Sequence, residues 1–453
     1  MAIGDNGTAV ETDILGRRKI APLFDATKGA FFWLSGFFVV YCARPEDWVP
    51  GLRYAPLAKI TAILAMWGLF NSQGRMKRTF KDVPKEGKLL LTMIGLLVVS
   101  SLLSPIWKGG SLSKTLDFSK VYVAWVLTFL LITTFERLRR IIFIQAASVV
   151  VVAVVSIAKG HGTPRLEGVL GGIYSNPNDL AFALVLSLPF ALAFMVTAKN
   201  GFIKAIWLGG MLVMSTALFM TASRAGFLNL LITGSVTLYH FGIKGKRYYL
   251  IAATLVVGTL LMATVGGKLY DRFHAISGDA GGEESAEASY EARKYLMARA
   301  LVGIEHYPIL GVGPRNFNTY SLIWHEVHMT YLQICVEGGI PVLIIYLMFF
   351  ASGFRNLRIL RNTKNLDEHT VLFIGALHSS LVGFAVGALF APEAYQFFPY
   401  FAVAFTATLL QTVREREREQ QQGPGPVAPA PKKPRHFLEA YADHRRTAPA
   451  PVQ

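Results

Sequence analysis

Two histidines, His325 and His328, stand at the start of an apolar run in the segment IWHEVHMTYLQICVEGGIP. Histidine titrates near neutral pH, so it is the side chain best suited to accept a proton from a hydroxyl group. Two histidines three residues apart also suit a metal ion, but no third ligand has a clear spacing and HEVH is not the HExxH pattern. His328 is therefore a candidate proton acceptor, and no metal ion is expected. The alternative is a capping or interfacial histidine.

Two arginines are candidates for holding an anion. Arg224 lies in TASRAG between two apolar runs with almost no loop, and Arg293 lies in the polar segment EASYEARKYLMARALVG. A guanidinium stays charged, is costly to desolvate and binds phosphate or diphosphate in a bidentate manner. The small neighbours Ser223, Ala225 and Gly226 leave room for a bulky ligand. The alternatives are an Arg224 that reaches lipid phosphates and an Arg293 on a solvated helix face.

Further polar and aromatic side chains accompany these groups. Glu337 lies in VEGGIP, one or two turns into the apolar run after His328, where purely structural pairing or a helix break is the alternative role. Asn178 lies in NPNDLA, a segment whose polar side chains suit the cap of a helix. The remaining supporting candidates are Arg315, Tyr320, Trp324 and Tyr331.

The composition predicts the kind of fold that must position these residues. The chain has 453 residues, of which 53% are hydrophobic and 16% are charged. Soluble domains are about a quarter charged, so we expect an all-α polytopic membrane protein. The net charge is +16, but the basic residues lie in short loops between apolar runs, which indicates membrane topology and not a nucleic-acid partner. The only two cysteines, Cys42 and Cys335, lie beside or within apolar runs and argue against a disulfide framework.

About twelve apolar runs are long enough to cross a bilayer. They cover residues 29–43, 56–72, 88–105, 118–135, 140–158, 179–197, 201–221, 224–241, 248–266, 329–351, 371–390 and 396–413. Every second loop is basic, namely 73–88, 136–140, 198–204, 242–247 and 352–370. The positive-inside rule then places both termini in the cytoplasm and Arg224 and His328 on the outer side.

The chain divides into three predicted regions. We expect a cytoplasmic segment at 1–28 without a cleavable signal peptide, a membrane domain at 29–413, and a disordered cytoplasmic tail at 414–453. The outward segment 267–328 separates the ninth span from the tenth.

That outward segment contains a predicted amphipathic helix at 286–306. Its apolar side is expected to carry Tyr290, Leu296, Ala300 and Leu301. Arg293, Lys294 and Arg299 would then line a surface for an anionic substrate.

The order and sidedness of these motifs resemble the O-antigen ligase and polymerase superfamily of bacterial inner-membrane glycosyltransferases. The shared features are SRAG at 223–226, Arg293 shortly before a PxxGVGxxxF pattern at 308–317, and HxxYLQxxxExG beginning at His328. The RPED and NPNDLA segments resemble the branch associated with exopolysaccharide and O-glycosylation systems. Many members have Asn after the histidine, where this chain has Met329, so the downstream YLQ and Glu-Gly assign the histidine to His328.

The resemblance, which covers nearly all of residues 30–413, implies a chemistry for the site. The donor would be a glycan on undecaprenyl diphosphate, bound at the periplasmic face of the inner membrane. Arg224 and Arg293 would hold the diphosphate, and His328 would activate the acceptor hydroxyl with inversion at the anomeric carbon. No cofactor is implied. Tyr320 and Trp324 suit stacking against sugars, although an interfacial aromatic belt explains them equally well.

The acceptor and the class of protein stay open at this point. Lipid A core would define a ligase, a second lipid-linked glycan a polymerase, and a serine or threonine a protein O-glycosylation enzyme. A transporter or flippase for an anionic lipid or solute is the alternative class, and it requires ionisable groups near mid-membrane on several helices. Here only Glu337 and His378 lie deep in apolar runs. A scaffold of a polysaccharide assembly complex would tolerate changes at Arg224 and His328.

Overall fold

The structure is a computed structural model, and it describes part of the chain. The described residues are 10–12, 18–20, 25–160, 165–168, 173–174, 176–267, 269–270, 284–323 and 325–421. The chain separates into two compact units, Met1–Leu410 and Gln411–Gln453. The predictions for Trp324, for the side chain of Tyr290 and for most of the tail concern positions outside the described residues.

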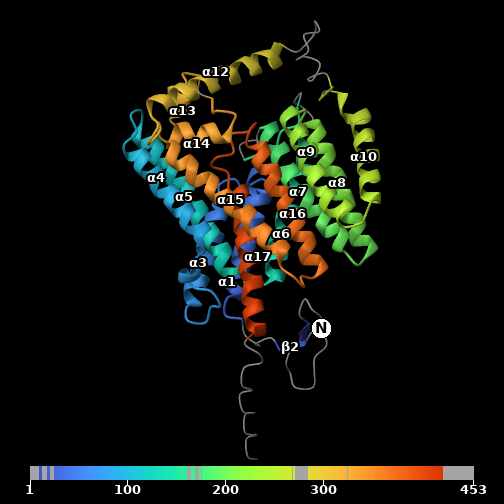
Figure 1. The fold of residues 1–453 in the computed structure, drawn as a ribbon. Coiled ribbons are helices and arrows are strands. Elements are labelled where there is room, and N and C mark those ends of the chain that lie inside the picture. Colours follow the sequence, from blue (N-terminus) through green and yellow to red (C-terminus); the bar gives the residue numbers. More distant parts are fainter. Residues whose placement is uncertain are drawn as a thin grey trace, which may run out of the picture. The chain divides into compact units, whose positions relative to one another are not determined.

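Helices form nearly all of the described chain (Figure 1). They are α1 (Lys28–Ala43), α2 (Pro45–Trp48), α3 (Leu57–Asn71), α4 (Lys85–Leu102), α5 (Lys108–Leu131), α6 (Phe135–Lys159), α7 (Pro177–Thr197), α8 (Gly201–Met220), α9 (Arg224–Leu238), α10 (Tyr249–Val265), α12 (Glu284–His306), α13 (Phe317–Tyr320), α14 (Thr330–Gly338), α15 (Ile340–Asn362), α16 (Glu368–Gly387) and α17 (Phe398–Gln421), with a 3₁₀ turn η1 (Phe80–Asp82) and a π-helical turn η2 (Tyr239–Ile243). Two short antiparallel strands, β1 (Val10–Thr12) and β2 (Arg18–Ile20), precede them. The predicted all-helical class is confirmed.

Several of these helices are suited to a bilayer. In the described residues, 6 helices are long and apolar enough to cross a membrane: Phe135–Lys159, Pro177–Thr197, Gly201–Met220, Arg224–Ile243, Thr330–Asn362 and Glu368–Gly387. The shorter apolar helices are Lys28–Ala43, Leu57–Asn71 and Tyr249–Val265. The chain is therefore a multi-pass membrane protein by length and composition. The count of about twelve spans and the orientation remain predictions.

Helix α5 begins about three turns before the span that the apolar pattern predicted. Its first turns carry Ser111 and Thr115, which hydrogen-bond to Ser101 of α4 at 2.9 and 2.8 Å. The polar start of the helix is thus buried against a polar position of its neighbour. A search for apolar runs cannot detect such a start, and the predicted span, which began at residue 118, started too late.

Helix α6 also begins early, at Phe135 and not near residue 140. Thr134 caps it, with its hydroxyl accepting from the Arg137 N–H at 3.2 Å. The Arg137 guanidinium donates to the Leu131 carbonyl at 2.6 Å and pairs with Asp25. The basic residues predicted to form a loop therefore lie in the first turns of the helix.

The predicted span at 329–351 is not one continuous helix, because the chain breaks at Gly339 into α14 and α15. The two helices together, Thr330–Asn362, still form one candidate membrane span. Gly339 has φ 84°, and a Cβ there would lie 2.1 Å from the Ile309 carbonyl oxygen. The Ile340 N–H donates to the Pro308 carbonyl at 2.8 Å. The break sets the short α14, which follows His328, apart from the long α15.

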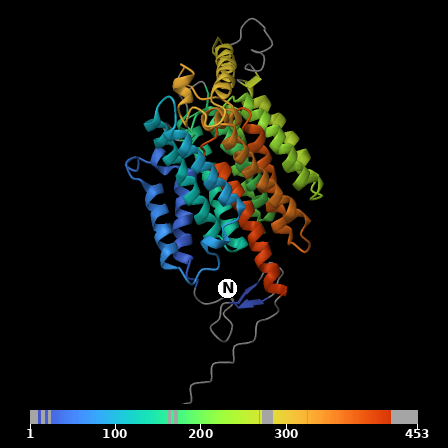
Figure 2. The same cartoon turned by 60° about the vertical axis from the view of Figure 1, so that its left-hand side comes forward.

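Helix α12 lies beyond one end of the helices of the first unit, next to α14 (Figures 1 and 2). Leu296 and Ala300 are buried there, as predicted, whereas the predicted apolar residue Leu301 is 58% exposed. The buried side runs along an i, i+4 row that continues to the partly buried Ile304, and Leu301 lies off that row. The row packs on a hydrophobic cluster that contains Val312, Phe317, Val327 and Val336.

Candidate functional site

The SRAG motif forms the tight turn between α8 and α9. Ala222 has φ 46°, in the left-handed region, and Ser223 is the N-cap of α9, with its Oγ accepting from the Gly226 N–H at 3.1 Å. Arg224 is therefore the first residue of α9, and it is half-buried. A Cβ on Gly226 would lie 2.6 Å from the Cβ of Ala181, so this glycine allows α7 and α9 to approach closely.

Asn178 connects this turn to the start of α7. Its Oδ1 accepts from Ser223 Oγ at 2.7 Å and from Arg165 Nη2 at 3.3 Å. Arg165 also donates from Nε to the Thr221 carbonyl at 3.0 Å. The helix cap itself is Asn176, which accepts from the Asn178 N–H at 2.8 Å. Asn178 is thus a bridge between helices, and Arg165 is a participant that the sequence motifs did not single out.

His328 lies in the loop just before α14 and is half-buried. Its Nδ1 is buried and makes no hydrogen bond to any described residue. Burial lowers the pKa of His328 to about 4, and the nearby charges of Arg293 and His325 contribute to the lowering. The imidazole is therefore neutral at physiological pH and retains a nitrogen lone pair.

Arg293 approaches His328 from α12, where it is half-buried. The two residues lie close enough for the charge of Arg293 to act on the imidazole. The hydrophobic cluster beneath α12 includes Leu296 on the helix and Val327 beside His328. The structure thus brings the predicted base and one predicted anion-binding arginine together.

Buried and half-buried carboxyl groups connect the His328 loop to α7 and to the loop after α16. Glu326 and Glu393 interact electrostatically with each other and with Asp179 in the first turn of α7. Burial raises the pKa of Glu326, and the charge of Lys114 opposes that shift. Burial raises the pKa of Glu393 well above its ordinary value, with further contributions from Asp179 and Glu326. Sequence reasoning missed this group, because its members come from three segments whose meeting depends on the packing of the helices.

Hydrogen bonds hold the start of α14 against the chain that follows α16. Thr330 donates from its N–H to the Ala388 carbonyl at 2.8 Å and from Oγ1 to the Ala391 carbonyl at 2.6 Å. Thr330 Oγ1 also accepts from the Glu393 N–H at 2.9 Å. The Tyr331 hydroxyl donates to the Ala385 carbonyl at 2.7 Å. Tyr331 therefore has a structural contact, and these bonds fix the position of the loop that carries His328.

Glu337 is 1% exposed, and its Oε2 accepts from the Tyr395 hydroxyl at 2.7 Å. Lys114 lies over the Tyr395 ring, with Nζ 5.2 Å from the ring centroid. The Arg315 N–H also bonds to the Glu337 carboxylate, while the Arg315 side chain is exposed. These contacts give Glu337 a structural setting just before the helix break at Gly339.

The GVG motif forms a turn that caps the end of α14. Val312 donates its N–H to the Val336 carbonyl and Gly313 to the Glu337 carbonyl, both at 2.9 Å. Gly311 has φ 65°, and a Cβ there would lie 2.5 Å from the Glu337 carbonyl carbon. The turn satisfies carbonyls that a helix end leaves free.

The other predicted candidates lie in different settings. The Arg299 guanidinium stands 4.9 Å above the centre of the Tyr320 ring and donates to the Tyr320 carbonyl at 3.1 Å. Lys294 is exposed and lies 4.0 Å from Glu291, and His325 is exposed. Among the cations predicted along α12, Arg293 is therefore the one whose charge acts on His328.

The fold and site together define a multi-pass membrane protein with a partly buried, charged site at one end of its helices. Residues 209–347 match the family model described as O-Antigen ligase. This range contains Arg224, Arg293 and His328.

The chain is also similar to the teichuronic acid biosynthesis protein TuaE of Bacillus subtilis (strain 168). The two are 26% identical over 236 residues, which cover 48% of this chain and 46% of the relative. The chain thus spans about half the length of the curated relative that it matches. Both comparisons confirm the resemblance to the O-antigen ligase and polymerase type of protein.

Proposed function

We propose that the protein is an inverting, metal-independent glycosyltransferase of the bacterial inner membrane. It transfers a glycan from an undecaprenyl-diphosphate donor to an acceptor hydroxyl at the periplasmic face. The observation that carries the proposal is the buried Nδ1 of His328, which has no hydrogen-bond partner among the described residues, on an imidazole whose pKa is lowered by the charge of Arg293. A neutral base beside a fixed cation is the pair of groups that displacement of a diphosphate requires.

The reaction assigns each group a task. The acceptor oxygen bonds to the anomeric carbon while the bond from that carbon to the diphosphate oxygen breaks. The electron pair leaves with the diphosphate, and the hydroxyl proton passes to His328. Arg224 and Arg293 stabilise the charge that builds up on the diphosphate, as fixed cations do in a site of low polarity. They supply what a bound metal supplies in other diphosphate-releasing sites, so chelators should not inhibit transfer.

Donor binding would also strengthen the base. The positive charge of Arg293 is one cause of the low pKa of His328. A bound diphosphate offsets that charge, and the pKa of His328 rises toward its ordinary value near 6.5. The base would therefore gain proton affinity only when the leaving group is in place.

The buried carboxyl groups are compatible with an anionic donor. Ionised Glu326 and Glu393 would repel a diphosphate, but the raised pKa of each favours the protonated, neutral form. In that form each group can donate a hydrogen bond. Their neutral state also fits the cost of holding charge at the margin of a membrane.

Transfer by the purified full-length chain in nanodiscs, with EDTA present, tests the proposal. The donor is a lipid-diphosphate-linked oligosaccharide, given alone, with lipid A core, or with a serine-containing peptide. Longer lipid-linked chains from donor alone identify a polymerase, and product that requires the core or the peptide identifies the acceptor. His328→Ala and Arg224→Ala should each lower the rate of transfer by at least about 10²-fold, while the matched control His325→Ala should retain it. Transfer at the wild-type rate by both His328→Ala and Arg224→Ala contradicts the proposal.

A further inference from the structure

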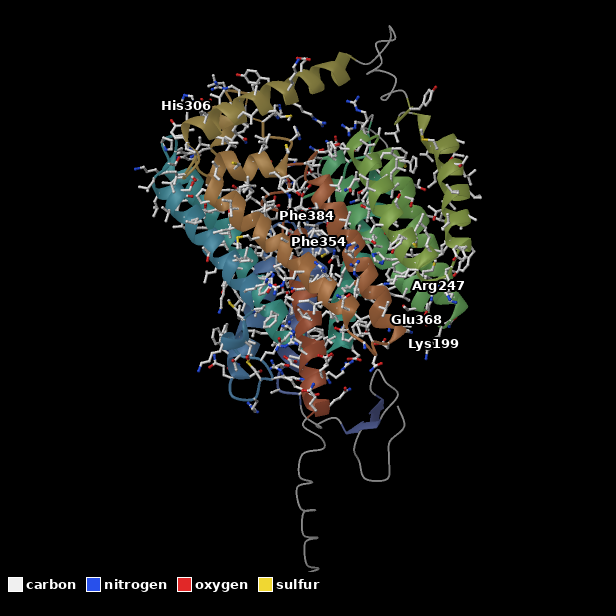
Figure 3. The ribbon with its side chains drawn as sticks, in the orientation of Figure 1. Lys199, Arg247, His306, Phe354, Glu368 and Phe384 are labelled. Atoms are coloured by element: carbon white, nitrogen blue, oxygen red, sulfur yellow. The ribbon has the colours of Figure 1, made fainter. Side chains whose placement is uncertain are left out.

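A second charged feature lies at the other end of the first unit. Figure 3 shows His306, the last residue of α12, near one end of the helices of the first unit. The ion pair Arg247–Glu368 lies toward the opposite end. Next to that ion pair is a cavity of about 280 Å³ between the turn that follows η2 and the start of α16. The volume far exceeds the ~30 Å³ share of one water molecule, so the cavity has room for a multi-atom group.

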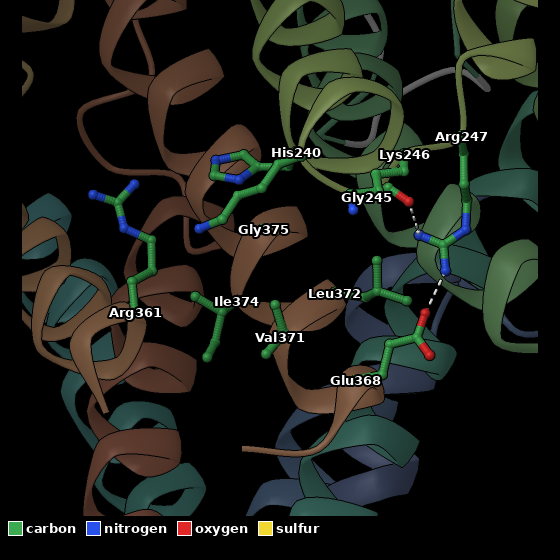
Figure 4. A pocket seen from close by; sticks show the side chains of 11 residues that line it. His240, Gly245, Lys246, Arg247, Arg361, Glu368, Val371, Leu372, Ile374 and Gly375 are labelled. Atoms are coloured by element: carbon green, nitrogen blue, oxygen red, sulfur yellow. Dashed lines mark hydrogen bonds and ion pairs between the residues drawn. The ribbon is translucent and has the colours of Figure 1, made fainter. Parts of the chain in front are cut away.

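The cavity is lined by cations from two segments that are distant in sequence. Lys244, Lys246 and Arg247 come from the turn after η2, and Arg361 comes from the end of α15. Figure 4 shows Arg361 on one side and Lys246 and Arg247 on the other, with His240 between them.

Most of this positive charge is not neutralised within the described chain. Arg247 pairs with Glu368, the one carboxylate in the lining. Lys244, Lys246 and Arg361 have no acidic partner among the described residues, and all three are exposed. Like charges that converge on one cavity repel each other, so the arrangement favours a bound anion.

The local backbone gives the cavity a defined wall. Residues Tyr239–Ile243 form a π-helical turn, a feature that is frequent at functional sites. Lys246 has φ 55°, a left-handed conformation that is uncommon for a lysine. His240 Nε2 lies 3.0 Å from His378 Nδ1, and a Cβ on Gly375 would lie 3.1 Å from the His240 Cβ. The His240 ring is thus held against α16, which closes one side of the cavity.

We infer that this cavity binds a phosphate oxyanion, and that the phosphate belongs to the headgroup of an anionic phospholipid. Apolar side chains next to the cavity remain exposed, as acyl chains would require: Tyr239 53%, Ile243 50%, Tyr248 63% and Val371 44%. Basic pockets between membrane helices bind lipid headgroups in this manner. The loops 242–247 and 352–370 are among those predicted to face the cytoplasm, so the lipid comes from the cytoplasmic leaflet.

A matched pair of double variants distinguishes specific binding in the cavity from general attraction of anionic lipid by the basic residues of cytoplasmic loops. Lys246→Gln combined with Arg361→Gln removes two charges from the cavity. Lys199→Gln combined with Lys204→Gln removes two charges from exposed positions just before α8 and in its first turn, outside the cavity lining. All four positions are exposed, so both double variants should fold.

The full-length protein in detergent is titrated with phosphatidylglycerol, phosphatidylcholine or sodium phosphate, and bound ligand is counted by native mass spectrometry. We expect preferential binding of phosphatidylglycerol, weakened at least about tenfold in the cavity variant and unchanged in the control. Sodium phosphate that binds alone with the same dependence on the variants supports the oxyanion site and assigns a soluble source. Equal binding of both lipids, equal weakening in both variants, or wild-type binding by the cavity variant overturns the inference.

Discussion

The two ends of the helical unit hold charged groups in opposite ways. At the α12 end, Glu393 is buried and His328 and Glu326 are half-buried, and burial shifts the pKa of each toward its neutral form. At the other end, Lys246 and Arg361 are exposed and line an open cavity. Burial tunes the affinity of a group for protons, which chemistry requires, whereas exposure preserves full charge, which suits the binding of an anion.

The largest effect expected from this difference is at His328. His328→Ala should lower kcat for glycan transfer by about 10²- to 10⁴-fold, the range usual for loss of a general base. His325→Ala, three residues away at an exposed position, should stay near wild type. Initial rates with a saturating lipid-linked donor measure both. Equal loss in the two variants would show that the segment as a whole, and not the base, determines the rate.

A substitution at Arg224 distinguishes bidentate hydrogen bonding to the diphosphate from the effect of positive charge alone. Arg224→Lys keeps the positive charge but loses the planar fork of the guanidinium, so transfer should fall by about 10²-fold. Lys246→Gln, at the other end, should leave transfer unchanged. Measurement of kcat/KM for both variants checks the contrast. Full activity of Arg224→Lys would mean that this arginine does not hold the diphosphate through two hydrogen bonds.

The pH dependence should also differ between free enzyme and donor complex. His328 accepts a proton only when neutral, and its pKa is about 4, so kcat/KM should fall about tenfold per unit only as pH drops below that value. The kcat profile should fall at a higher pH, because the bound diphosphate offsets Arg293. Stopped assays in nanodiscs between about pH 3.5 and about pH 8 measure the profiles of kcat/KM and of kcat. If kcat falls at the same pH as kcat/KM, or at a lower pH, the coupling of His328 to Arg293 is refuted.

A smaller effect is expected from the hydroxyl that holds the start of α14. Thr330→Val removes the bonds to the Ala391 carbonyl and the Glu393 N–H and leaves both backbone groups without this partner. The free energy of unfolding should decrease by about 1–3 kcal/mol. Thr330→Ser keeps the hydroxyl and should lose less. Denaturant titration in detergent compares the two, and equal stability of wild type and Thr330→Val would show that this contact is not important.

Sequence patterns were informative wherever the determinant is local. The SRAG turn follows from two apolar runs with no loop between them, and α12 follows from a polar segment that ends before Pro308. The early start of α5 was missed because its polar residues are satisfied by Ser101 of another helix. A helix break near Glu337 was one of the alternatives that the VEGGIP segment suggested, but the close approach of Ile309 that requires Gly339 is not visible in the sequence.

The candidate site shows the same division between local and long-range determinants. Motif order predicted His328, Arg224 and Arg293 as individual candidates. The proximity of Glu326 and Glu393, and the convergence of Lys246 and Arg361 on one cavity, require segments far apart in the chain to pack together. A basic loop has the same sequence pattern whether or not it lines a cavity. Only the three-dimensional structure therefore distinguishes basic residues that merely follow the positive-inside rule from basic residues that line a cavity.

We propose that the two ends have separate roles, and one crossed measurement tests this separation most directly. Glycan transfer and phosphatidylglycerol binding are measured on the same preparations of wild type, His328→Ala, and Lys246→Gln combined with Arg361→Gln. We expect His328→Ala to lose transfer and keep lipid binding, and the cavity variant to lose lipid binding and keep transfer. Transfer by His328→Ala at the wild-type rate would contradict the account.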